Sequence, residues 1–221
     1  MAVIHRTTLS PSKLELLTSW LPSRPWYRGG AGEPELVKAG GFRLDDPQGE
    51  VGIEFIVVTD TSGTHPTTYL VPLTYRGAPL EGAEHALVGT MEHGVLGRRW
   101  AYDGCHDPVL VARLPALIEG RIQAQDQNTS DTPDREVTCS YNGDGLASTD
   151  FAGVATDDHE CTELLASHGV ALRLHRVLHP ASGNTPVLPP EATGHVAGSW
   201  RLPDGTRARG LFVVLHSNSR D

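Results

Sequence analysis

The chain carries two apolar runs, Val51-Gly-Ile-Glu-Phe-Ile-Val-Val-Thr59 and Thr67-Thr-Tyr-Leu-Val-Pro-Leu-Thr-Tyr75, on either side of the turn-rich segment Asp60-Thr-Ser-Gly-Thr-His-Pro66. Residues that favour strands dominate both runs, and the Asp, Gly and Pro between them favour a turn. The pattern therefore predicts an antiparallel hairpin. Because Pro72 has no backbone N–H, we expect the second strand to lie at a sheet edge or to carry a bulge.

Further strand and helix patterns surround this hairpin. Leu36–Leu44 alternates as a strand does, and shorter strand patterns occur at 85–89 and 97–102. A serine- and proline-containing start followed by leucines three and four residues apart predicts a short amphipathic helix within 9–21. Asp107 followed by Pro108 is typical of a helix N-cap and first turn, so we expect a second helix there.

The second half of the chain contains another set of strand patterns. Residues 123–134 are polar and show no periodicity, which indicates a linker or a long exposed loop. Beyond them, Leu202-Pro-Asp-Gly205 is a strong hairpin turn signal. The predicted strands occupy 136–141, 169–178, 194–201 and 207–215.

These patterns predict an α+β fold made of two antiparallel β-sheet units with few flanking helices. We expect the first domain at residues 1–122, a linker at 123–134 and a second domain at 135–221. A length of 221 residues is consistent with two compact units, because domains most often contain roughly 100–150 residues.

Charge and hydropathy exclude several classes of partner. The formal net charge of -9 would repel phosphate backbones, so we expect no nucleic acid partner. No apolar run approaches the roughly 18 residues that span a bilayer, and the first residues do not resemble a secretory signal. We therefore expect a cytoplasmic protein with no membrane partner. Its three cysteines would remain thiols in a reducing compartment.

Three stretches of the first half resemble the N-terminal cap domain of actinobacterial maltokinases. Leu17-Thr-Ser-Trp-Leu-Pro-Ser-Arg-Pro-Trp-Tyr27 is similar to the opening helix and Trp-rich turn of that domain, and Tyr102-Asp-Gly-Cys-His-Asp-Pro108 is similar to its closing strand-to-helix junction. Tyr69-Leu-Val-Pro-Leu73 lies between them in the expected order. The resemblance covers approximately the first 120 residues.

The order of elements in the second half resembles the nucleotide-facing N-lobe of the same kinases, which are similar to aminoglycoside phosphotransferases. Val170-Ala-Leu-Arg-Leu-His-Arg-Val-Leu178 stands where such enzymes have the strand with a phosphate-binding lysine, and Arg173 occupies the lysine's place. The resemblance implies ATP with Mg²⁺ as the ligands of this lobe. An arginine can still bind phosphate, although its planar fork has a different reach.

The parts that perform phosphoryl transfer are not recognisable in the sequence. A kinase needs an aspartate beside the acceptor hydroxyl and further groups that hold Mg²⁺, all supplied by a C-terminal lobe. No His-Gly-Asp run followed by Asn and no Walker sequence occurs. The four prolines of 180–190 disfavour the helix that would carry the glutamate partner of the lysine. We therefore assign no catalytic residue.

Other candidate sites have plainer explanations. Trp20, Trp26 and Tyr27 could form a sugar platform, but packing of the first helix onto the sheet is the favoured interpretation. His106-Asp107 and His159-Glu160-Cys161 contain residue types that bind zinc, yet neither has zinc-site spacing, so surface and capping roles are favoured. A Cys-His-Asp hydrolase at 105–107 is disfavoured because adjacent side chains rarely converge.

From these features we expect a non-catalytic, stand-alone relative of the maltokinase cap that binds or regulates a sugar-metabolism enzyme. The parent family phosphorylates maltose with ATP in trehalose-to-glycogen metabolism, so the resemblance implies that pathway or another sugar-phosphorylating system. One alternative is the N-terminal half of a split ATP-dependent sugar kinase, completed by a separate C-lobe chain. Another is a nucleotide- or carbohydrate-binding module without chemistry.

Overall fold

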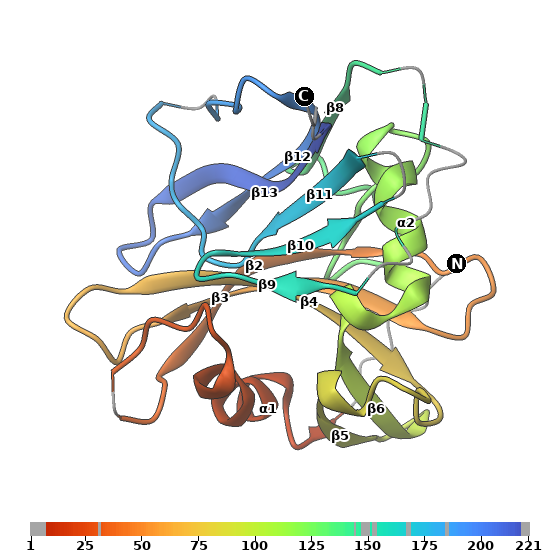
Figure 1. The fold of residues 1–221 in the computed structure, drawn as a ribbon. Coiled ribbons are helices and arrows are strands. Elements are labelled where there is room, and N and C mark those ends of the chain that lie inside the picture. The colour runs from red at the N-terminus through yellow and green to blue at the C-terminus, as the bar shows by residue number, and fades with distance from the viewer. Residues whose placement is uncertain are drawn as a thin grey trace.

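A computed structural model describes residues 8–30, 32–143, 145–146, 151, 154–166, 169–183 and 186–217. Within these residues two antiparallel sheets and two short α-helices form the molecule (Figure 1). The α+β prediction with few helices is therefore confirmed. No helix in the described part of the chain is long and apolar enough to cross a membrane.

The first sheet is built around the predicted hairpin. Its strand order is β1-β5-β6-β4-β3-β2-β7. The strands are β1 Leu9–Ser10, β2 Leu36–Leu44, β3 Gly52–Asp60, β4 Thr67–Arg76, β5 Leu87–His93, β6 Gly97–Asp103 and β7 Gln125–Asp126. Strand β7 lies in the stretch predicted to be a linker, and it pairs with β2 at Phe42 and Arg43. The division into two domains stays a prediction.

Pro72 lies in a central strand, so the expectation of an edge or bulge was wrong. It stands opposite Phe55 in an unbroken register between β3 and β4. On the other side of β4, strand β6 pairs only with residues 73–76, and residues 176–178 run beside residues 68–70. Pro72 falls between these two partners, where the sheet needs no N–H donor.

The second sheet has the order β8-β12-β13-β11-β10-β9. Its strands are β8 Thr138–Tyr141, β9 Thr156–Asp157, β10 Cys161–Leu165, β11 Val170–His175, β12 Ala192–Arg201 and β13 Arg207–Ser217. The predicted strands and the 202–205 turn are confirmed. Sequence analysis missed β9, which has only two residues, and β10, whose sequence Cys161-Thr-Glu-Leu-Leu165 shows no regular alternation.

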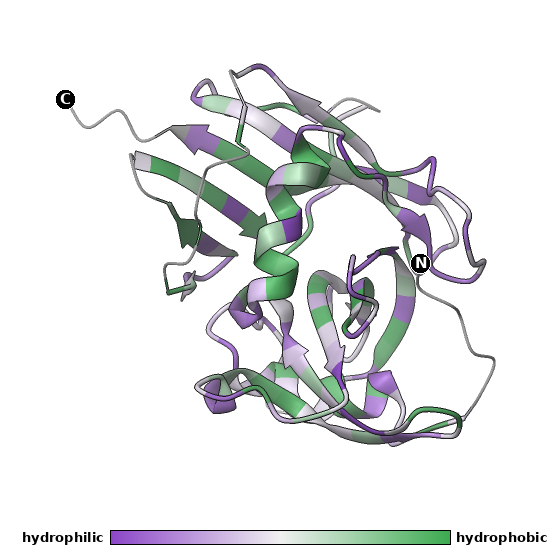
Figure 2. Cartoon of the chain, turned by 90° about the vertical axis from the view of Figure 1, so that its right-hand side faces the viewer, coloured by the Kyte–Doolittle hydropathy of each residue, from purple (hydrophilic) through white to green (hydrophobic). Residues whose placement is uncertain are grey.

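Both helices begin where the sequence indicates. Helix α1, Lys13–Trp20, starts with a capping box between Ser12 and Glu15. Helix α2, Pro108–Ile118, is capped by the Asp107 side chain, which accepts the Val109 backbone N–H and also receives two hydrogen bonds from Arg76. Figure 2 shows α2 between the two sheets, where its apolar residues close one side of the core.

One buried apolar cluster joins the two sheets. The Phe42 ring lies parallel to Phe55 of its own sheet, with ring centroids 4.4 Å apart, and parallel to Phe212 of the other, at 6.1 Å. The same cluster contains apolar residues of β10–β13 and of α2. Burial of this shared core therefore fixes the sheets against each other.

A buried ion pair and a backbone ladder also connect the sheets. Arg176, which is 0% exposed, follows β11 and donates from Nη2 to Asp103 Oδ2 at 2.6 Å and from Nε to Thr162 Oγ1 at 2.6 Å. Its guanidinium lies 5.0 Å from the Trp26 ring centroid. Beside it, Leu70 N–H donates to the Arg176 carbonyl and Leu178 N–H donates to the Thr68 carbonyl.

The Arg176→Met variant should be about 3–5 kcal/mol less stable, because the substitution leaves the buried Asp103 carboxyl without its ion-pair partner. The free energy of unfolding in urea, followed by tryptophan fluorescence, measures this loss. An Arg98→Met control breaks the exposed Arg98–Glu92 pair and should cost less than about 1 kcal/mol. Equal losses in the two variants would contradict the role assigned to Arg176.

Candidate functional site

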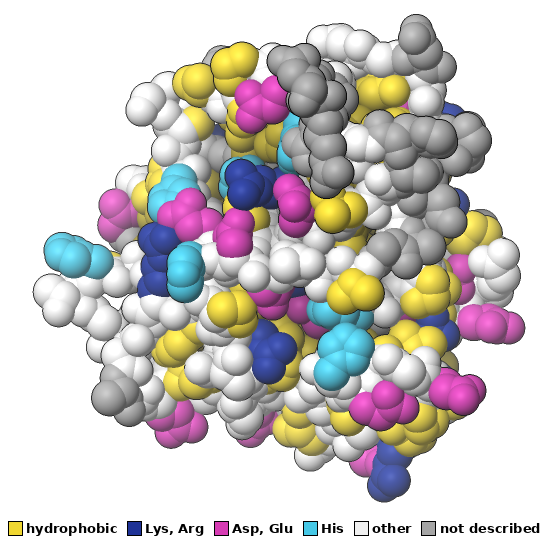
Figure 3. Space-filling view, viewed as in Figure 1, with side chains coloured by type: hydrophobic (Ala, Val, Ile, Leu, Met, Phe, Trp, Pro, Cys, Tyr) yellow, Lys and Arg dark blue, Asp and Glu magenta, His cyan; other side chains and the backbone are white. Residues whose placement is uncertain are grey.

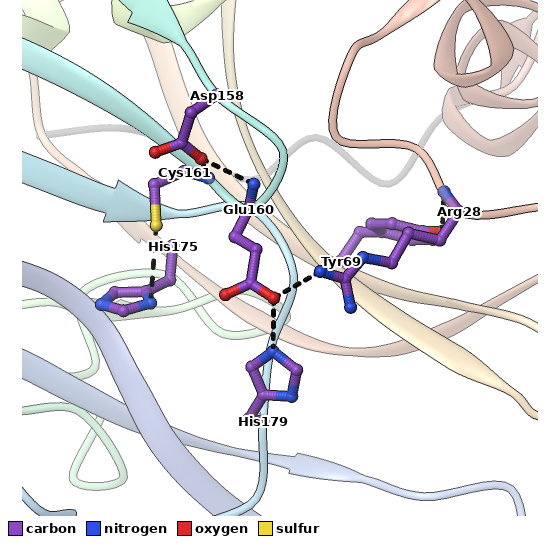
Figure 4. Close-up of polar contacts among 7 residues, drawn as sticks. All are labelled: Arg28, Tyr69, Asp158, Glu160, Cys161, His175 and His179. Atoms are coloured by element: carbon purple, nitrogen blue, oxygen red, sulfur yellow. Dashed lines mark hydrogen bonds and ion pairs between the residues drawn. The ribbon is translucent and has the colours of Figure 1, made fainter.

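Charged and imidazole side chains meet at the junction between the sheets. They come from the turn after α1, from the β9–β10 turn and from the end of β11 (Figure 4). Glu160 lies at their centre, where it forms an ion pair with Arg28 and lies 3.5 Å from His179 Nε2. Residues 132 positions apart in the chain are thus in contact at this junction.

The turn after α1 positions Arg28. Tyr69 of β4 accepts the Arg28 backbone N–H on its hydroxyl at 2.9 Å, and the neighbouring Tyr27 donates to Asp60 Oδ2 at 2.8 Å. The guanidinium is then directed toward Glu160. The hydrogen bond from Arg28 is the largest factor that lowers the pKa of Glu160, so this carboxylate is ionised at neutral pH.

Asp158 organises the β9–β10 turn and contacts Arg173. Its Oδ1 accepts the backbone N–H groups of Glu160 and Cys161, both at 2.7 Å, and its Oδ2 accepts Arg173 Nη2 at 3.1 Å. Burial acts to raise the pKa of Asp158, but the two N–H donors and the Arg173 charge outweigh it and lower the pKa. The turn therefore presents two ionised carboxylates, each beside an arginine.

Cys161 and His175 are in contact as a neutral thiol and a neutral imidazole. The Cys161 Sγ lies 3.8 Å from His175 Nδ1, while His175 Nε2 is buried and has no hydrogen-bond partner in the described part of the chain. Burial raises the pKa of Cys161 to about 11 and lowers the pKa of His175 to about 4. A neutral thiol is a poor nucleophile, so this pair lacks the activated state of a cysteine hydrolase.

Arg173 lies on the face of the second sheet that is turned away from the core. Leu172 and Leu174 belong to the core cluster, so the alternation of β11 directs Arg173 outward. Its side chain is 47% exposed. Glu163 of β10 stands opposite Arg173, and on the other side the same row of paired residues continues through Val214 of β13 to His195 of β12. We call this surface the outer face, defined by Glu163, Arg173, His195 and His216.

The three aromatic residues predicted as a packing cluster or a sugar platform lie close together beside the junction. Trp26 is 0% exposed and Trp20 is 6% exposed, and both belong to a second core cluster. Their ring centroids are 5.8 Å apart, and the Trp26 ring lies 5.9 Å from the Tyr69 ring. Tyr27 is only partly buried. In this conformation the indole faces contact the protein and leave no open platform.

Residues 105–107, considered above as a metal or hydrolase site, do not direct their side chains toward one another. His106 Nδ1 lies 3.1 Å from His85 Nε2, whereas Asp107 is 0% exposed and bonded to Arg76. Cys105 is buried, and burial raises the pKa of its thiol. Among the residues that the structure describes, no three histidine, cysteine, aspartate or glutamate side chains are grouped to hold a metal ion.

Part of the first sheet is similar to a known protein family. Residues 20–107 match the family model of the maltokinase N-terminal cap domain. The match begins at the last residue of α1 and ends at the N-cap of α2, so it contains β2–β6 and the Arg28 and Tyr69 side of the junction, while the Glu160 side lies outside it. The cap resemblance is confirmed for these residues. The kinase-like interpretation of the second half stays a prediction. A search of curated proteins found no match.

Sequence analysis missed the residues that hold the junction together. Glu160 was considered only within a metal motif, and Arg176 and Arg28 were not singled out. One signal was present, since Arg173 and His175 alternate with leucines and Arg176 directly after His175 breaks that alternation, which places a charge on the apolar side of the predicted strand. A charge in such a place usually needs a buried partner, but the sequence does not indicate that Asp103 provides it.

His175 should make stability depend on pH. Its folded-state pKa of about 4 lies below the ordinary value of 6.5, so the unfolded chain binds a proton between these values and the folded chain does not. Stability should fall as the pH is lowered from 6.5 towards 4, by up to about 3 kcal/mol at roughly 1.4 kcal/mol per pKa unit. Urea unfolding at a series of pH values measures this.

The His175→Gln variant should lose that part of the pH dependence. A His65→Gln control removes an imidazole from the exposed turn between β3 and β4 and should behave as the wild type does. Identical pH profiles for the wild type and His175→Gln would show that His175 is protonated as easily in the folded chain as in the unfolded one.

Proposed function

We propose that this chain is a non-catalytic relative of the maltokinase cap that binds an enzyme of sugar phosphorylation through the outer face of its second sheet. The observation that carries the proposal is the Arg173–Asp158 pair on that face, beside Glu163 and the exposed Leu165. Figure 3 shows basic, acidic, histidine and hydrophobic side chains together on the side of the molecule where β9–β11 lie.

The chemistry of the junction favours recognition over catalysis. The carboxylates of Glu160 and Asp158 are ionised and engaged by arginines, and the Cys161–His175 pair is neutral. The Arg173 and Asp158 side chains, 47% and 48% exposed, present charges of both signs that suit a protein partner with a complementary pattern. The match of residues 20–107 to the maltokinase cap supports a partner from the same metabolism, such as trehalose-to-glycogen conversion.

Adding the chain to a maltokinase should change kcat/KM for maltose by about fivefold or more, the lower end of typical couplings between bound sites. The initial rate of maltose phosphorylation at increasing chain concentration measures the effect. The Arg173→Glu variant should lose it, because the substitution reverses the charge beside Asp158. The Arg98→Glu control reverses an arginine on the β5–β6 hairpin whose side chain is 64% exposed, against 47% for Arg173, and should keep the effect.

An unchanged rate together with separate elution of the two proteins in size-exclusion chromatography would contradict the proposal. Phosphorylation of maltose by the chain alone, with Mg-ATP, would contradict its non-catalytic part. Phosphorylation only when a separate kinase C-lobe is added would support the split-kinase alternative instead.

Nucleotide binding without chemistry is a second candidate, favoured by the exposure of Arg173 at the place where related kinases are expected to hold phosphate. It predicts saturable heat when Mg-ATP is titrated into the protein, and loss of that heat in Arg173→Ala. Calorimetry of both proteins, with Arg98→Ala as the matched control, measures this. Absence of heat in the wild type would remove the nucleotide candidate and leave partner binding.

A further inference from the structure

Two histidine side chains from separate turns meet at the protein surface. His85 Nε2 lies 3.1 Å from His106 Nδ1, and the two rings are nearly perpendicular, with centroids 4.7 Å apart. His85 is exposed and His106 is partly buried. Neither residue belongs to the junction around Glu160 or to the outer face, so the roles assigned above leave this pair unexplained.

Packing beneath the first turn fixes the position of His85. This turn is the 3₁₀ helix Glu84–Ala86, and its Ala86 is 1% exposed. Ala86 belongs with Ala83 and Tyr102 to a third buried apolar cluster, and its N–H donates to the Ala83 carbonyl at 2.9 Å. The backbone that bears His85 is therefore held against the sheet.

Hydrogen bonds on both sides of His106 fix the second turn. This turn is the 3₁₀ helix Gly104–His106, between β6 and α2. The Asp103 side chain accepts the Cys105 N–H at 3.1 Å, and the Asp107 N–H donates to the carbonyl of the first turn residue at 3.0 Å. Both imidazoles therefore project from fixed backbone, which limits the ordering that a shared ligand would require.

The separation of the two nitrogens suits a metal ion. A Zn²⁺ ion about 2.0–2.1 Å from two imidazole nitrogens holds them about 2.9 Å apart at a right angle and about 3.4 Å apart at the tetrahedral angle. The observed 3.1 Å lies between these values. The nitrogens face each other, so the rings must tilt for both lone pairs to reach the ion. Because His85 is exposed, it has room for that tilt.

The protonation of His106 leaves a lone pair available. Burial is the largest factor that lowers the pKa of His106, and the carboxylates of Asp103 and Asp157 only partly offset it. The pKa therefore lies below the ordinary 6.5, and His106 is neutral at pH 7. With its proton on Nε2 it has a free lone pair on Nδ1, and His85 with its proton on Nδ1 has one on Nε2.

We propose that His85 and His106 together bind Zn²⁺ or a similar divalent transition-metal ion, with water in the remaining coordination positions. Imidazole nitrogen is a favoured ligand of such ions, whereas Mg²⁺ prefers oxygen. An exposed hydrogen bond between the rings adds little stability by itself, because water competes for both partners. No third histidine, cysteine, aspartate or glutamate completes the site within the described residues, so it stays open to a donor from another molecule.

Calorimetric titration of the full chain with ZnCl₂ and NiCl₂ tests the site, with MgCl₂ as the oxygen-preferring control. Zn²⁺ and Ni²⁺ should bind and Mg²⁺ should not. The His85→Gln and His106→Gln variants should each bind at least about 100-fold more weakly, because two linked ligands exceed one by about 10²–10⁴ in affinity. His65→Gln removes an imidazole from the exposed turn between β3 and β4 and should bind as the wild type does.

Two further measurements separate this site from loss of fold and from adventitious binding. His85→Gln should unfold at the same urea concentration as the wild type, because His85 is exposed. In NMR spectra, paramagnetic Ni²⁺ should broaden the ring-proton signals of His85 and His106 before those of His65. Absence of Zn²⁺ and Ni²⁺ binding, equal affinity in the wild type and His85→Gln, or first broadening at another histidine would overturn the assignment. Because Arg173 lies on the outer face, Arg173→Glu should leave Zn²⁺ binding intact even if partner binding fails.

Discussion

The buried ion pair between Arg176 and Asp103 is the interaction on which the arrangement of the two sheets depends. Burial alone would lower the pKa of Arg176, but the nearby Asp103 carboxylate raises it, so the guanidinium remains charged inside the protein. A charge in this place is stable only while its partner is held at hydrogen-bond distance. The pairing of residues 176–178 with residues 68–70 provides that constraint.

The surface junction follows from this buried contact. Because β11 leads directly into Arg176, the position of Arg176 determines where the adjacent His175 and the β9–β10 turn lie relative to β4. Glu160 then lies within reach of Arg28, and Asp158 within reach of Arg173. A cap-matching segment and the second sheet are thereby joined by a polar contact at the surface, while a pocket beside Gly40 is lined by residues of β2, β12 and β13.

Most strands and both helices could be predicted because their signals are local. Ser12 and Asp107 cap the helices with their own side chains, and Leu202-Pro-Asp-Gly205 forms its turn from neighbouring residues. Pro72 shows the limit of such reasoning. Its missing N–H costs no hydrogen bond, because β6 pairs with β4 only beyond Pro72 and residues 176–178 pair with β4 only before it. The sequence pattern of a strand does not indicate which distant segments will pair with it.

The sequence by itself determined the α+β class, strands β2–β6 of the first sheet and the resemblance to the maltokinase cap, because periodicity, turn residues and local motifs act over a few residues. Tertiary structure alone decided that Trp26 is buried against Arg176, that Arg173 faces outward beside Asp158, and that Gly40 and Trp200 border one pocket. These contacts join residues far apart in the chain, and their free energy depends on burial and distance, which exist only after the sheets have packed.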